Sequence, residues 1–148
     1  MTCGELMTKA VAFCWRDDRV DVAARLMRDR NIGALVVMGP DMHPIGIVTD
    51  RDLAVSICAD AEDSYYKRVK EVMRSPVVCC RDDDDVAAVL NAMADQHVRR
   101  IPIVDANGRL AGIISIDDLA RSLDSEVISP LLEGTNLAQS AKNKGLVE

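Results

Sequence analysis

The sequence carries one 52-residue pattern twice. When the chain is shifted by 66 positions, residues 5–56 align with residues 71–122 without a gap, and 15 of the 52 aligned positions are identical. Sequences of ordinary composition share about one position in fifteen by chance. Two copies of a supersecondary unit this short usually stack to bury a core that neither could bury alone. The repeat therefore predicts a duplicated fold with two related clefts, which favours binding over catalysis.

Composition limits the possible functions. The chain has 148 residues, of which 49% are hydrophobic, so one domain-sized core is expected. Its only aromatic residues are Phe13, Trp15, Tyr65 and Tyr66, so this core should be aliphatic. A net charge of −6 argues against nonspecific binding to nucleic acid. No apolar run reaches the roughly 18 residues of a membrane span, and no signal segment opens the chain, so we expect a cytoplasmic protein.

The five cysteines fit neither a disulfide framework nor a zinc motif. Their number is odd, and no C-x-x-C spacing occurs. Cys79 and Cys80 are adjacent and should point to opposite faces of a strand. Burial as small hydrophobic residues is the favoured interpretation. Redox sensing through Cys79 and Cys80, or metal capture at Cys3, stays open as an alternative.

Each copy is expected to form a lead-in helix followed by a β-α-β-β-α unit. In the first copy we expect a lead-in helix ending near Met7, strands at 11–14, 34–38 and 45–49, and helices from about Val20 and Asp52. In the second copy we expect the lead-in helix to end near Met73, strands at 77–80, 100–104 and 110–115, and helices from about Val86 and Asp118. The first long helix is indicated by apolar residues at i, i+3, i+4 and i+7.

Boundaries and turns follow from local signals. We place the first repeat at residues 1–62, the second at 63–124 and a C-terminal segment at 125–148, with a short helix at 127–132 and a frayed end at 136–148. The acidic stretches 16–18 and 82–85 are expected to cap the helices that follow, with a cation site as the alternative. Asn107-Gly108 predicts a tight hairpin, because Gly accepts a positive φ.

Two related motifs close the hairpins and carry a family resemblance. They read Gly-Ile-Val-Thr-Asp-Arg-Asp at 46–52 and Gly-Ile-Ile-Ser-Ile-Asp-Asp at 112–118. Together with Val-Arg-Arg-Ile-Pro-Ile-Val-Asp at 98–105, they resemble tandem cystathionine-beta-synthase (CBS) domains, a pair often called a Bateman module. The resemblance covers about residues 3–124. It implies an α/β (α+β) fold of two CBS repeats packed with pseudo-two-fold symmetry.

The residue types in this motif suit a nucleoside phosphate, independently of the family resemblance. A strand that ends in Thr49 or Ser115 delivers a hydroxyl and free N–H groups to a helix N-terminus, which suits a phosphate. Three residues later, Asp52 or Asp118 can accept two hydrogen bonds from a ribose. Glycine at 46 and 112 would allow a planar base to approach the backbone. The simpler alternative is that Thr49 and Ser115 only cap their helices.

Other contacts come from the resemblance alone. Family members often place basic residues before the Ile-Pro of the first hairpin strand, where they reach ligand phosphates; here these are Arg99 and Arg100. The first copy has Gly33 and Ala34 at these positions, so Arg51 would have to compensate. The purine would lie against the first strand of each copy, at Val11 and Val77. The two sites are therefore expected to differ, and a solvated strand end remains the alternative for Arg99 and Arg100.

The expected function is regulatory. The chain lacks a Walker loop, a Gly-x-Ser-x-Gly elbow and a His-Glu-x-x-His motif, and His43 and His97 are interpreted as surface residues, so we expect no enzyme activity and no metal site. The leading hypothesis is a stand-alone sensor that binds AMP, ADP, ATP, S-adenosylmethionine or NAD between the repeats, requires no cofactor, forms a homodimer and acts on a separate effector protein. The alternative is a ligand-free dimeric scaffold with a role in a stress response.

Overall fold

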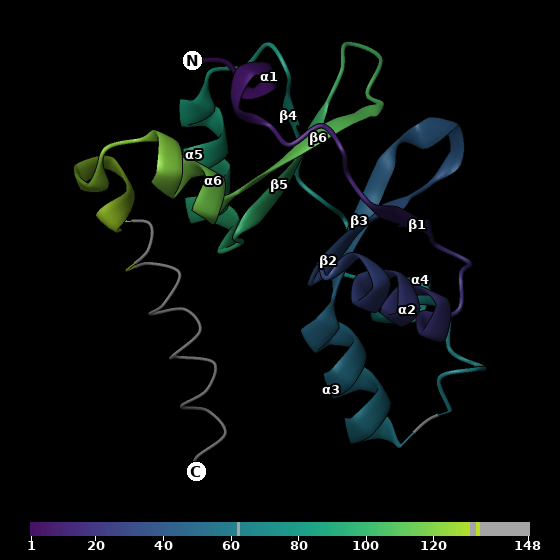
Figure 1. The fold of residues 1–148 in the computed structure, drawn as a ribbon. Coiled ribbons are helices and arrows are strands. Elements are labelled where there is room, and N and C mark those ends of the chain that lie inside the picture. The colour runs from purple at the N-terminus through teal and green to yellow at the C-terminus, as the bar shows by residue number, and fades with distance from the viewer. Residues whose placement is uncertain (62, 131–132, 134–148) are drawn as a thin grey trace. The chain divides into compact units, whose positions relative to one another are not determined.

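The computed structural model describes residues 1–61, 63–130 and 133. The chain divides into two compact units. The repeat-1 unit is Ala10–Val77, and the repeat-2 unit is Met1–Lys9 together with the chain from Val78 onward. Each unit has helices and one three-stranded sheet, which confirms the expected mixture of α and β structure (Figure 1).

The repeat-1 unit has the expected order of elements. They are β1 (Phe13–Trp15), α2 (Val20–Arg30), β2 (Ala34–Met38), the 3₁₀ turn η1 (Pro40–Met42), β3 (Pro44–Thr49), α3 (Asp50–Asp60) and α4 (Val69–Val72). The strands lie in the order β1-β2-β3, with β1 parallel and β3 antiparallel to β2. This is the predicted β-α-β-β-α unit, followed by the next lead-in helix.

The repeat-2 unit has the same topology. Its elements are α1 (Cys3–Leu6), β4 (Cys80–Arg81), α5 (Val86–Gln96), β5 (Arg100–Val104), β6 (Leu110–Ser115) and α6 (Ile116–Ser122). The strand order is β4-β5-β6, again with one parallel and one antiparallel pair. Residues 125–130 are helical, within the segment where a C-terminal helix was expected. The rest of that expected helix and the expected frayed end at 136–148 lie outside the described residues.

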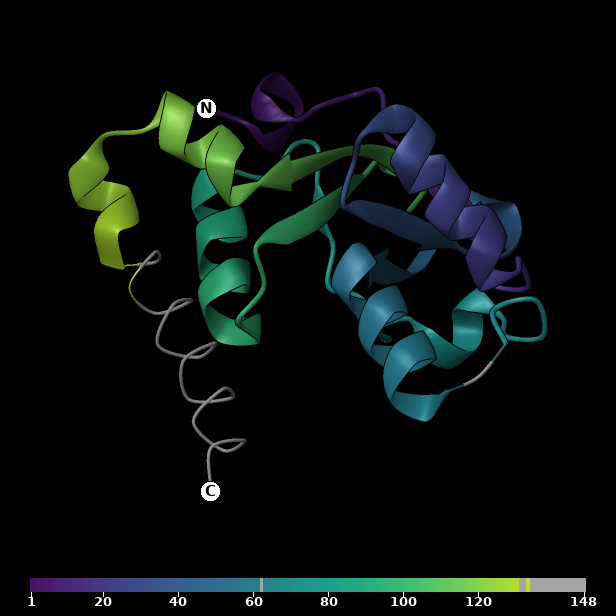
Figure 2. The same cartoon turned by 60° about the horizontal axis from the view of Figure 1, so that its bottom comes forward.

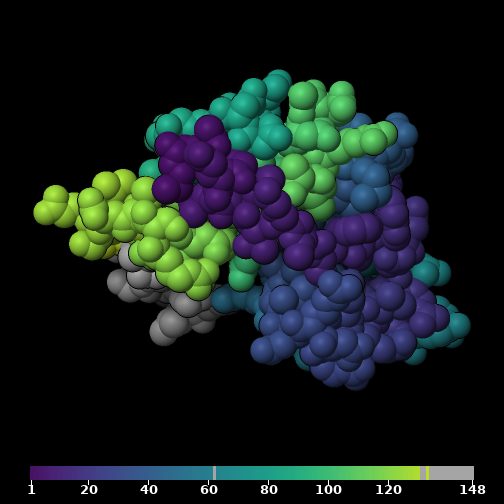
Figure 3. Space-filling model, turned by 45° about the horizontal axis from the view of Figure 1, so that its top comes forward, coloured from purple at the N-terminus to yellow at the C-terminus, as the bar shows by residue number. Residues whose placement is uncertain are grey.

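Each unit takes its lead-in segment from the other copy of the repeat. In the repeat-2 unit, Thr8 and Ile113 form an antiparallel bridge, with Thr8 N donating to Ile113 O at 2.9 Å and Ile113 N to Thr8 O at 3.0 Å. Figure 3 shows the N-terminal residues lying against the later residues of this unit. Arg74 and Ile47 form the corresponding bridge in the repeat-1 unit. The compact units therefore differ from a division of the sequence at residue 62.

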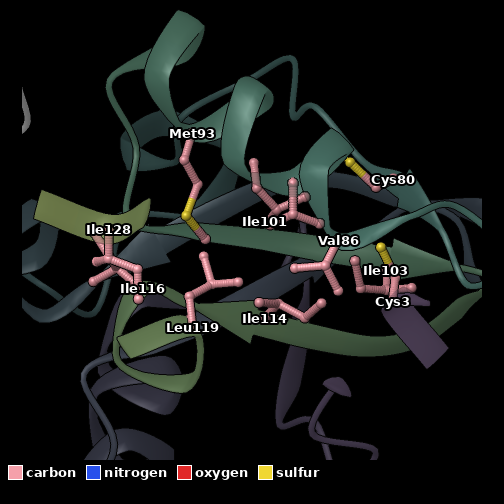
Figure 4. Close-up of a cluster of buried hydrophobic side chains, with 11 residues drawn as sticks. Cys3, Cys80, Val86, Met93, Ile101, Ile103, Ile114, Ile116, Leu119 and Ile128 are labelled. Atoms are coloured by element: carbon pink, nitrogen blue, oxygen red, sulfur yellow. The ribbon is translucent and has the colours of Figure 1, made fainter. Parts of the chain in front are cut away.

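Both hydrophobic cores are aliphatic, as expected from the composition. The repeat-1 core contains side chains from α2, α3, α4 and the sheet, among them Val20, Met27, Leu35, Val48 and Leu53. The repeat-2 core is built from Val, Ile, Leu, Met and Cys side chains (Figure 4). None of the four aromatic residues is buried, and Trp15, Tyr65 and Tyr66 are exposed.

The first strand of each copy begins later than predicted. Val11 and Val77, expected to open these strands, precede them in both copies of the repeat. In the repeat-1 unit the parallel ladder begins where Val36 N donates to Ala12 O at 3.4 Å. The position equivalent to Val36 in the second copy is Pro102, which has no N–H to donate. This explains why β4 is one residue shorter than β1.

The acidic stretches cap only one helix as expected. Asp85 is the N-cap of α5, and its carboxylate accepts a hydrogen bond from Ala87 N at 2.9 Å. The prediction for the first copy was wrong, because Arg19 occupies the N-cap position of α2 and makes no side-chain cap. The Asp18 carboxylate accepts instead from Trp15 N at 2.8 Å, which tightens the turn after β1. The C-caps agree in both copies: Asn31 and His97 both adopt the left-handed conformation.

Candidate functional site

The turn from β3 into α3 is closed by a reciprocal capping box. Thr49 N donates to Asp52 Oδ2 at 3.0 Å, and Asp52 N donates to Thr49 Oγ1 at 3.1 Å. The other carboxylate oxygen of Asp52 accepts from Arg74 Nε at 3.2 Å. Only 12% of the Asp52 side chain is exposed. Both predicted residues of this motif are therefore held together at the start of the helix.

The second copy builds the same box between β6 and α6. Ser115 N and Ser115 Oγ both donate to Asp118 Oδ2, at 2.8 and 2.7 Å. Asp118 N donates back to Ser115 Oγ at 3.2 Å, and Arg121 binds Asp118 Oδ1 at 2.7 Å. Burial alone would raise the pKa of Asp118, but the hydrogen bonds from Ser115 and Arg121 outweigh it and lower the pKa below its ordinary value.

Thr49 and Ser115 therefore cap their helices in both motifs. A carboxylate has about four acceptor positions, and the hydrogen bonds described above use three of those on Asp118 and two of those on Asp52. Both carboxylates therefore keep the capacity to accept from a hydroxyl group. Capping and ligand binding are compatible at the same residues.

Arg100 is the cation that the fold brings to the second motif. It lies opposite Ser115 in the antiparallel β5–β6 pair, so the two side chains share one face of the sheet. Arg99 precedes the strand, and its carbonyl accepts from Ile116 N at 2.9 Å at the start of α6. Both arginines are half-buried. Among the residues that the structure describes, no hydrogen bond or ion pair engages either guanidinium group.

The first motif lacks such a cation on its own strand. Ala34 lies opposite Thr49, and Gly33 O accepts from Asp50 N at 3.0 Å. Arg51, expected to compensate, is exposed, and its backbone N–H donates to Asp50 Oδ1 at 2.8 Å. The two sites therefore differ in charge, as the sequence indicated.

Arg74 is a site residue that sequence reasoning missed. It follows α4, and its backbone N–H and carbonyl both pair with Ile47 while its side chain binds Asp52. Arg74 and Asp52 lie 22 residues apart in sequence. The isolated β-bridge between Arg74 and Ile47 brings the two segments together. The aligned residue in the first copy is Thr8, so comparison of the repeats gave no signal for a cation.

The space beside each of the two motif glycines is filled by the protein itself. A Cβ atom on Gly112 would lie 2.7 Å from Met7 Cγ, and one on Gly46 would lie 2.8 Å from Arg74 O. Both glycines are buried under their lead-in segments. Packing of the lead-in segments therefore requires glycine at both positions. The predicted approach of a base to these glycines stays a prediction, as do base contacts at the half-buried Val11 and Val77.

Three of the cysteines are buried, as expected. These are Cys3, Cys14 and Cys80, whereas Cys79 is half-buried and Cys58 is exposed. Burial raises the pKa of the Cys14 thiol to about 12 and the pKa of the Cys79 thiol to about 11. Within residues 1–61, 63–130 and 133, no three His, Cys, Asp or Glu side chains gather where they could hold a metal ion. In the same residues, no helix is both long and apolar enough to cross a membrane.

Sequence comparison finds relatives of similar length. The chain is 35% identical over 138 residues to the uncharacterized protein YlbB of Bacillus subtilis, covering 89% of this chain and 92% of that protein. It is 30% identical over 127 residues to hypoxic response protein 1 of Mycobacterium tuberculosis, covering 86% and 88%. It is 34% identical over 100 residues to the uncharacterized protein MK0525 of Methanopyrus kandleri, covering 68% of this chain but spanning only half of that protein.

Solved structures share the fold. The crystal structure of hypoxic response protein I with two coordinated zinc ions superposes with a TM-score of 0.75 at 29% identity, covering 84% of this chain and all of that one. The CBS domain pair of protein MJ0100, solved with 5′-methylthioadenosine and S-adenosyl-L-methionine, gives a TM-score of 0.72 at 23% identity, covering 82% and 98%. The family model described as "CBS domain" matches residues 3–58 and 69–125. This chain therefore belongs to the CBS domain family and contains two copies of the domain.

Proposed function

We propose that this chain is a regulatory module that binds an adenosine-type ligand at the Ser115–Asp118 turn and acts on a separate partner protein. The observation that carries the proposal is the placement of Arg100 directly opposite Ser115, at the N-terminus of α6. A helix N-terminus and a half-buried guanidinium suit a phosphate, and among the described residues no hydrogen bond or ion pair engages the guanidinium of Arg100. The remaining acceptor capacity of Asp118 suits a ribose hydroxyl.

Comparison of the two motifs indicates which one binds. The capping box, the glycine and the helix start occur in both, whereas the arginine pair occurs only in the second copy. The ligand of protein MJ0100 gives the chemical class to test first, namely adenosine with a substituent on its 5′ carbon. A phosphate-bearing ligand is favoured here because the Arg100 side chain shares one face of the sheet with Ser115 at this turn. AMP, ADP, ATP and NAD are therefore placed ahead of S-adenosylmethionine.

We propose no catalytic reaction for this chain. Stand-alone CBS-pair proteins are generally regulatory, and the described part of the chain offers binding groups at this turn without a nucleophile and base positioned beside them. A ligand changes the output only through its different affinity for two conformations of the module.

The test is a thermal-shift and calorimetric panel of AMP, ADP, ATP, GTP, NAD and S-adenosylmethionine. A ligand at about 100 times its dissociation constant adds roughly 2.7 kcal/mol to the free energy of unfolding, which raises Tm by several degrees. Arg100→Ala removes a cation without removing a helix cap, so it should fold normally and bind about 10–100-fold more weakly. Arg109→Ala, at an exposed position in the same hairpin, is the matched control.

One observation favours the ligand-free scaffold as a second candidate. The capping boxes give Thr49, Asp52, Ser115 and Asp118 a structural role that needs no ligand. If no adenosine compound shifts Tm at millimolar concentration, the scaffold becomes the better description. If a shift appears but survives Arg100→Ala, the ligand binds elsewhere and the assignment to the second motif is wrong.

A further inference from the structure

Two segments that are far apart in the sequence lie side by side at the start of α2 in the repeat-1 unit. They are the turn after β1 and the segment that enters α4. Lys70 N donates to Arg16 O at 2.9 Å, and an isolated β-bridge joins Arg19 to Arg68. Figure 2 shows the start of α2, in purple, beside the teal loop that leads into α4. The two segments therefore form one continuous surface.

This surface is basic in an acidic protein. Residues 15–19 and 65–70 contain five Lys or Arg residues and two Asp residues, although the net charge of the whole chain is −6. Arg19 and Lys67 each bind an aspartate of the same unit. The other three basic residues are exposed, and they are Arg16, Arg68 and Lys70.

The three exposed cations surround a single carboxylate. Lys70 Nζ donates to Asp17 Oδ1 at 2.9 Å. This hydrogen bond is the main reason that the pKa of Asp17 is lowered, and the nearby charges of Arg16 and Arg68 lower it further. In the described part of the chain, no ion pair engages either of these two arginines. One carboxylate therefore stands among three cations, and two guanidinium groups can take further anions.

All four aromatic residues of the chain belong to the same region. Phe13 and Trp15 make an edge-to-face contact on β1, and Tyr65 and Tyr66 make another in the segment before α4. Trp15 is 45% exposed and Tyr66 is 77% exposed. Trp, Tyr and Arg are the residue types that most often dominate the binding energy of protein interfaces. Exposed aromatic rings beside exposed arginines therefore indicate a surface that binds another protein.

The second copy of the repeat shows that the fold does not require these cations. Gly4 stands at the position equivalent to Lys70, and Asp82 at the position equivalent to Arg16. Gly4 N donates to Asp82 O at 2.8 Å, so the same backbone pairing forms in the repeat-2 unit. The pairing of the two segments therefore does not account for the basic charge of the repeat-1 surface.

We propose that this surface docks an acidic segment of the separate partner protein, with carboxylates on Arg16 and Arg68 and an apolar side chain against Trp15. Arginine presents a planar fork of donors that binds a carboxylate through two hydrogen bonds. The indole of Trp15 lies next to Arg16 in the sequence and offers a large apolar area at low cost in conformational entropy. The proposal rests on the function proposed above only for the existence of a separate partner.

An anionic lipid surface is a less suitable occupant. Attachment to a bilayer through charge typically uses clusters of roughly four to eight Lys or Arg residues. Here the exposed cations are three, and one of them is already bound to Asp17. The net charge of −6 would also be repelled by an anionic bilayer. A short acidic protein segment fits the number of cations better.

The first test measures binding of a short fluorescein-labelled peptide in which Glu alternates with Ser around a central Leu. Fluorescence anisotropy should rise with wild type and not with the matched peptide that carries Gln in place of Glu. Arg16→Glu and Arg68→Glu should each weaken binding about 10-fold or more. Arg109→Glu makes the same change of charge at an exposed hairpin position and should bind as wild type does. Thermal melts check that all three variants fold.

Two results of this test would overturn the proposal. One is the absence of binding to wild type at millimolar peptide. The other is equal weakening by Arg109→Glu and Arg68→Glu, which would show that only the total charge of the protein attracts the peptide.

Trp15 reports independently on the location of the peptide, because it is the only tryptophan of the chain. Its emission should move to shorter wavelength when the peptide binds, and quenching by acrylamide should fall. Binding with unchanged emission would place the peptide elsewhere. Co-sedimentation of wild type with phosphatidylserine vesicles, abolished by Arg68→Glu, would identify a lipid surface instead. Adenosine-ligand binding by Arg68→Glu and peptide binding by Arg100→Ala separate this proposal from the function proposed above, because either can fail alone.

Discussion

Met73 occupies the space in which a side chain on Gly46 would stand. A Cβ atom on Gly46 would lie 2.9 Å from Met73 Sδ, far closer than two such atoms approach in ordinary packing. Met7 and Gly112 have the same relationship in the other unit. Met7 and Met73 are equivalent in the repeat, as are Gly46 and Gly112, yet each methionine meets the glycine of the other copy. These pairs fix the lead-in segments onto the last strand of each sheet.

Gly112→Ala should therefore destabilise the protein through overpacking. Its new methyl group would overlap Met7, and such overlaps cost about 1–3 kcal/mol. For a chain of this size, each kcal/mol lowers Tm by roughly 2–4 °C. Combining the substitution with Met7→Ala should cost less than the sum of the two single changes, measured in a double-mutant cycle by urea unfolding.

Gly33→Ala is the control for that experiment. A Cβ atom there would lie 3.1 Å from the Asp50 carboxylate, which is exposed and can move. Its cost should stay below about 1 kcal/mol. Equal effects of the two substitutions would mean that contact with Met7 is not the cause of the cost of Gly112→Ala.

Local signals in the sequence were sufficient for much of the fold. The hairpins and the last helix of each copy depend on neighbouring residues, such as Gly108 with its φ of 78° and the Ser115–Asp118 capping box. The positions of Thr49, Asp52, Ser115 and Asp118 at helix starts followed from the same signals. These elements were predicted because the residues that form them lie within a few positions of one another.

Contacts between distant segments could not be predicted. The length of β4 depends on Pro102 in the neighbouring strand, and the charge beside Asp52 depends on Arg74 from the next lead-in segment. The hydrophobic periodicity of a lead-in helix does not show which of the two sheets the helix packs against, because its pattern of apolar residues is the same in either case. The exchange of these helices between the two copies could therefore not be predicted. Three-dimensional pairing decides these features.

Asp85→Ala should remove a working helix cap. The Asp85 carboxylate accepts from Ala87 N, and loss of such a cap costs about 1 kcal/mol. Asp83→Ala is the control, because Asp83 caps no helix and its carboxylate forms an exposed ion pair with Arg81, worth less than about 1 kcal/mol. Urea unfolding monitored by circular dichroism measures both. If Asp83→Ala proved as costly, the acidic stretch would stabilise the fold through its total charge and not through the cap.

Thiol reactivity should separate one cysteine from the others. Cys58 is exposed, whereas burial raises the pKa of the Cys3 and Cys79 thiols to about 11 and that of Cys14 to about 12. At pH 8 about one in a thousand thiols with a pKa near 11 is ionised, so reaction with a chromogenic disulfide should be slow. One equivalent should react rapidly, and the remaining four only after denaturation.

Cys58→Ser should abolish that rapid phase. If more than one equivalent reacted rapidly in the folded wild type, Cys79 would be the first candidate, since it is half-buried and the other three thiols are buried. The redox alternative raised by Cys79 and Cys80 would then regain support. A single rapid equivalent leaves these cysteines as packing residues.

The pH dependence of stability should change when Asp118 is replaced. Hydrogen bonds from Ser115 and Arg121 lower the pKa of Asp118 in the folded protein despite its burial, so the carboxylate stabilises the fold above the ordinary pKa of 3.8. That contribution is lost as the pH falls through the lower, folded-state pKa. Asp118→Asn should therefore cost about 1–2 kcal/mol at pH 7, and the difference from wild type should shrink as the pH falls below the ordinary pKa of 3.8.

Asp117→Asn provides the matched control on the same helix turn. Asp117 is exposed, and no hydrogen bond to its carboxylate occurs among the described residues. Its replacement should change the free energy of unfolding by less than about 0.5 kcal/mol at pH 7. Urea unfolding at closely spaced pH values measures both variants against wild type. A wild-type advantage over Asp118→Asn that stays constant down to pH 2 would show that the amide loses its contacts for steric reasons, and that the charge of Asp118 does not stabilise the turn.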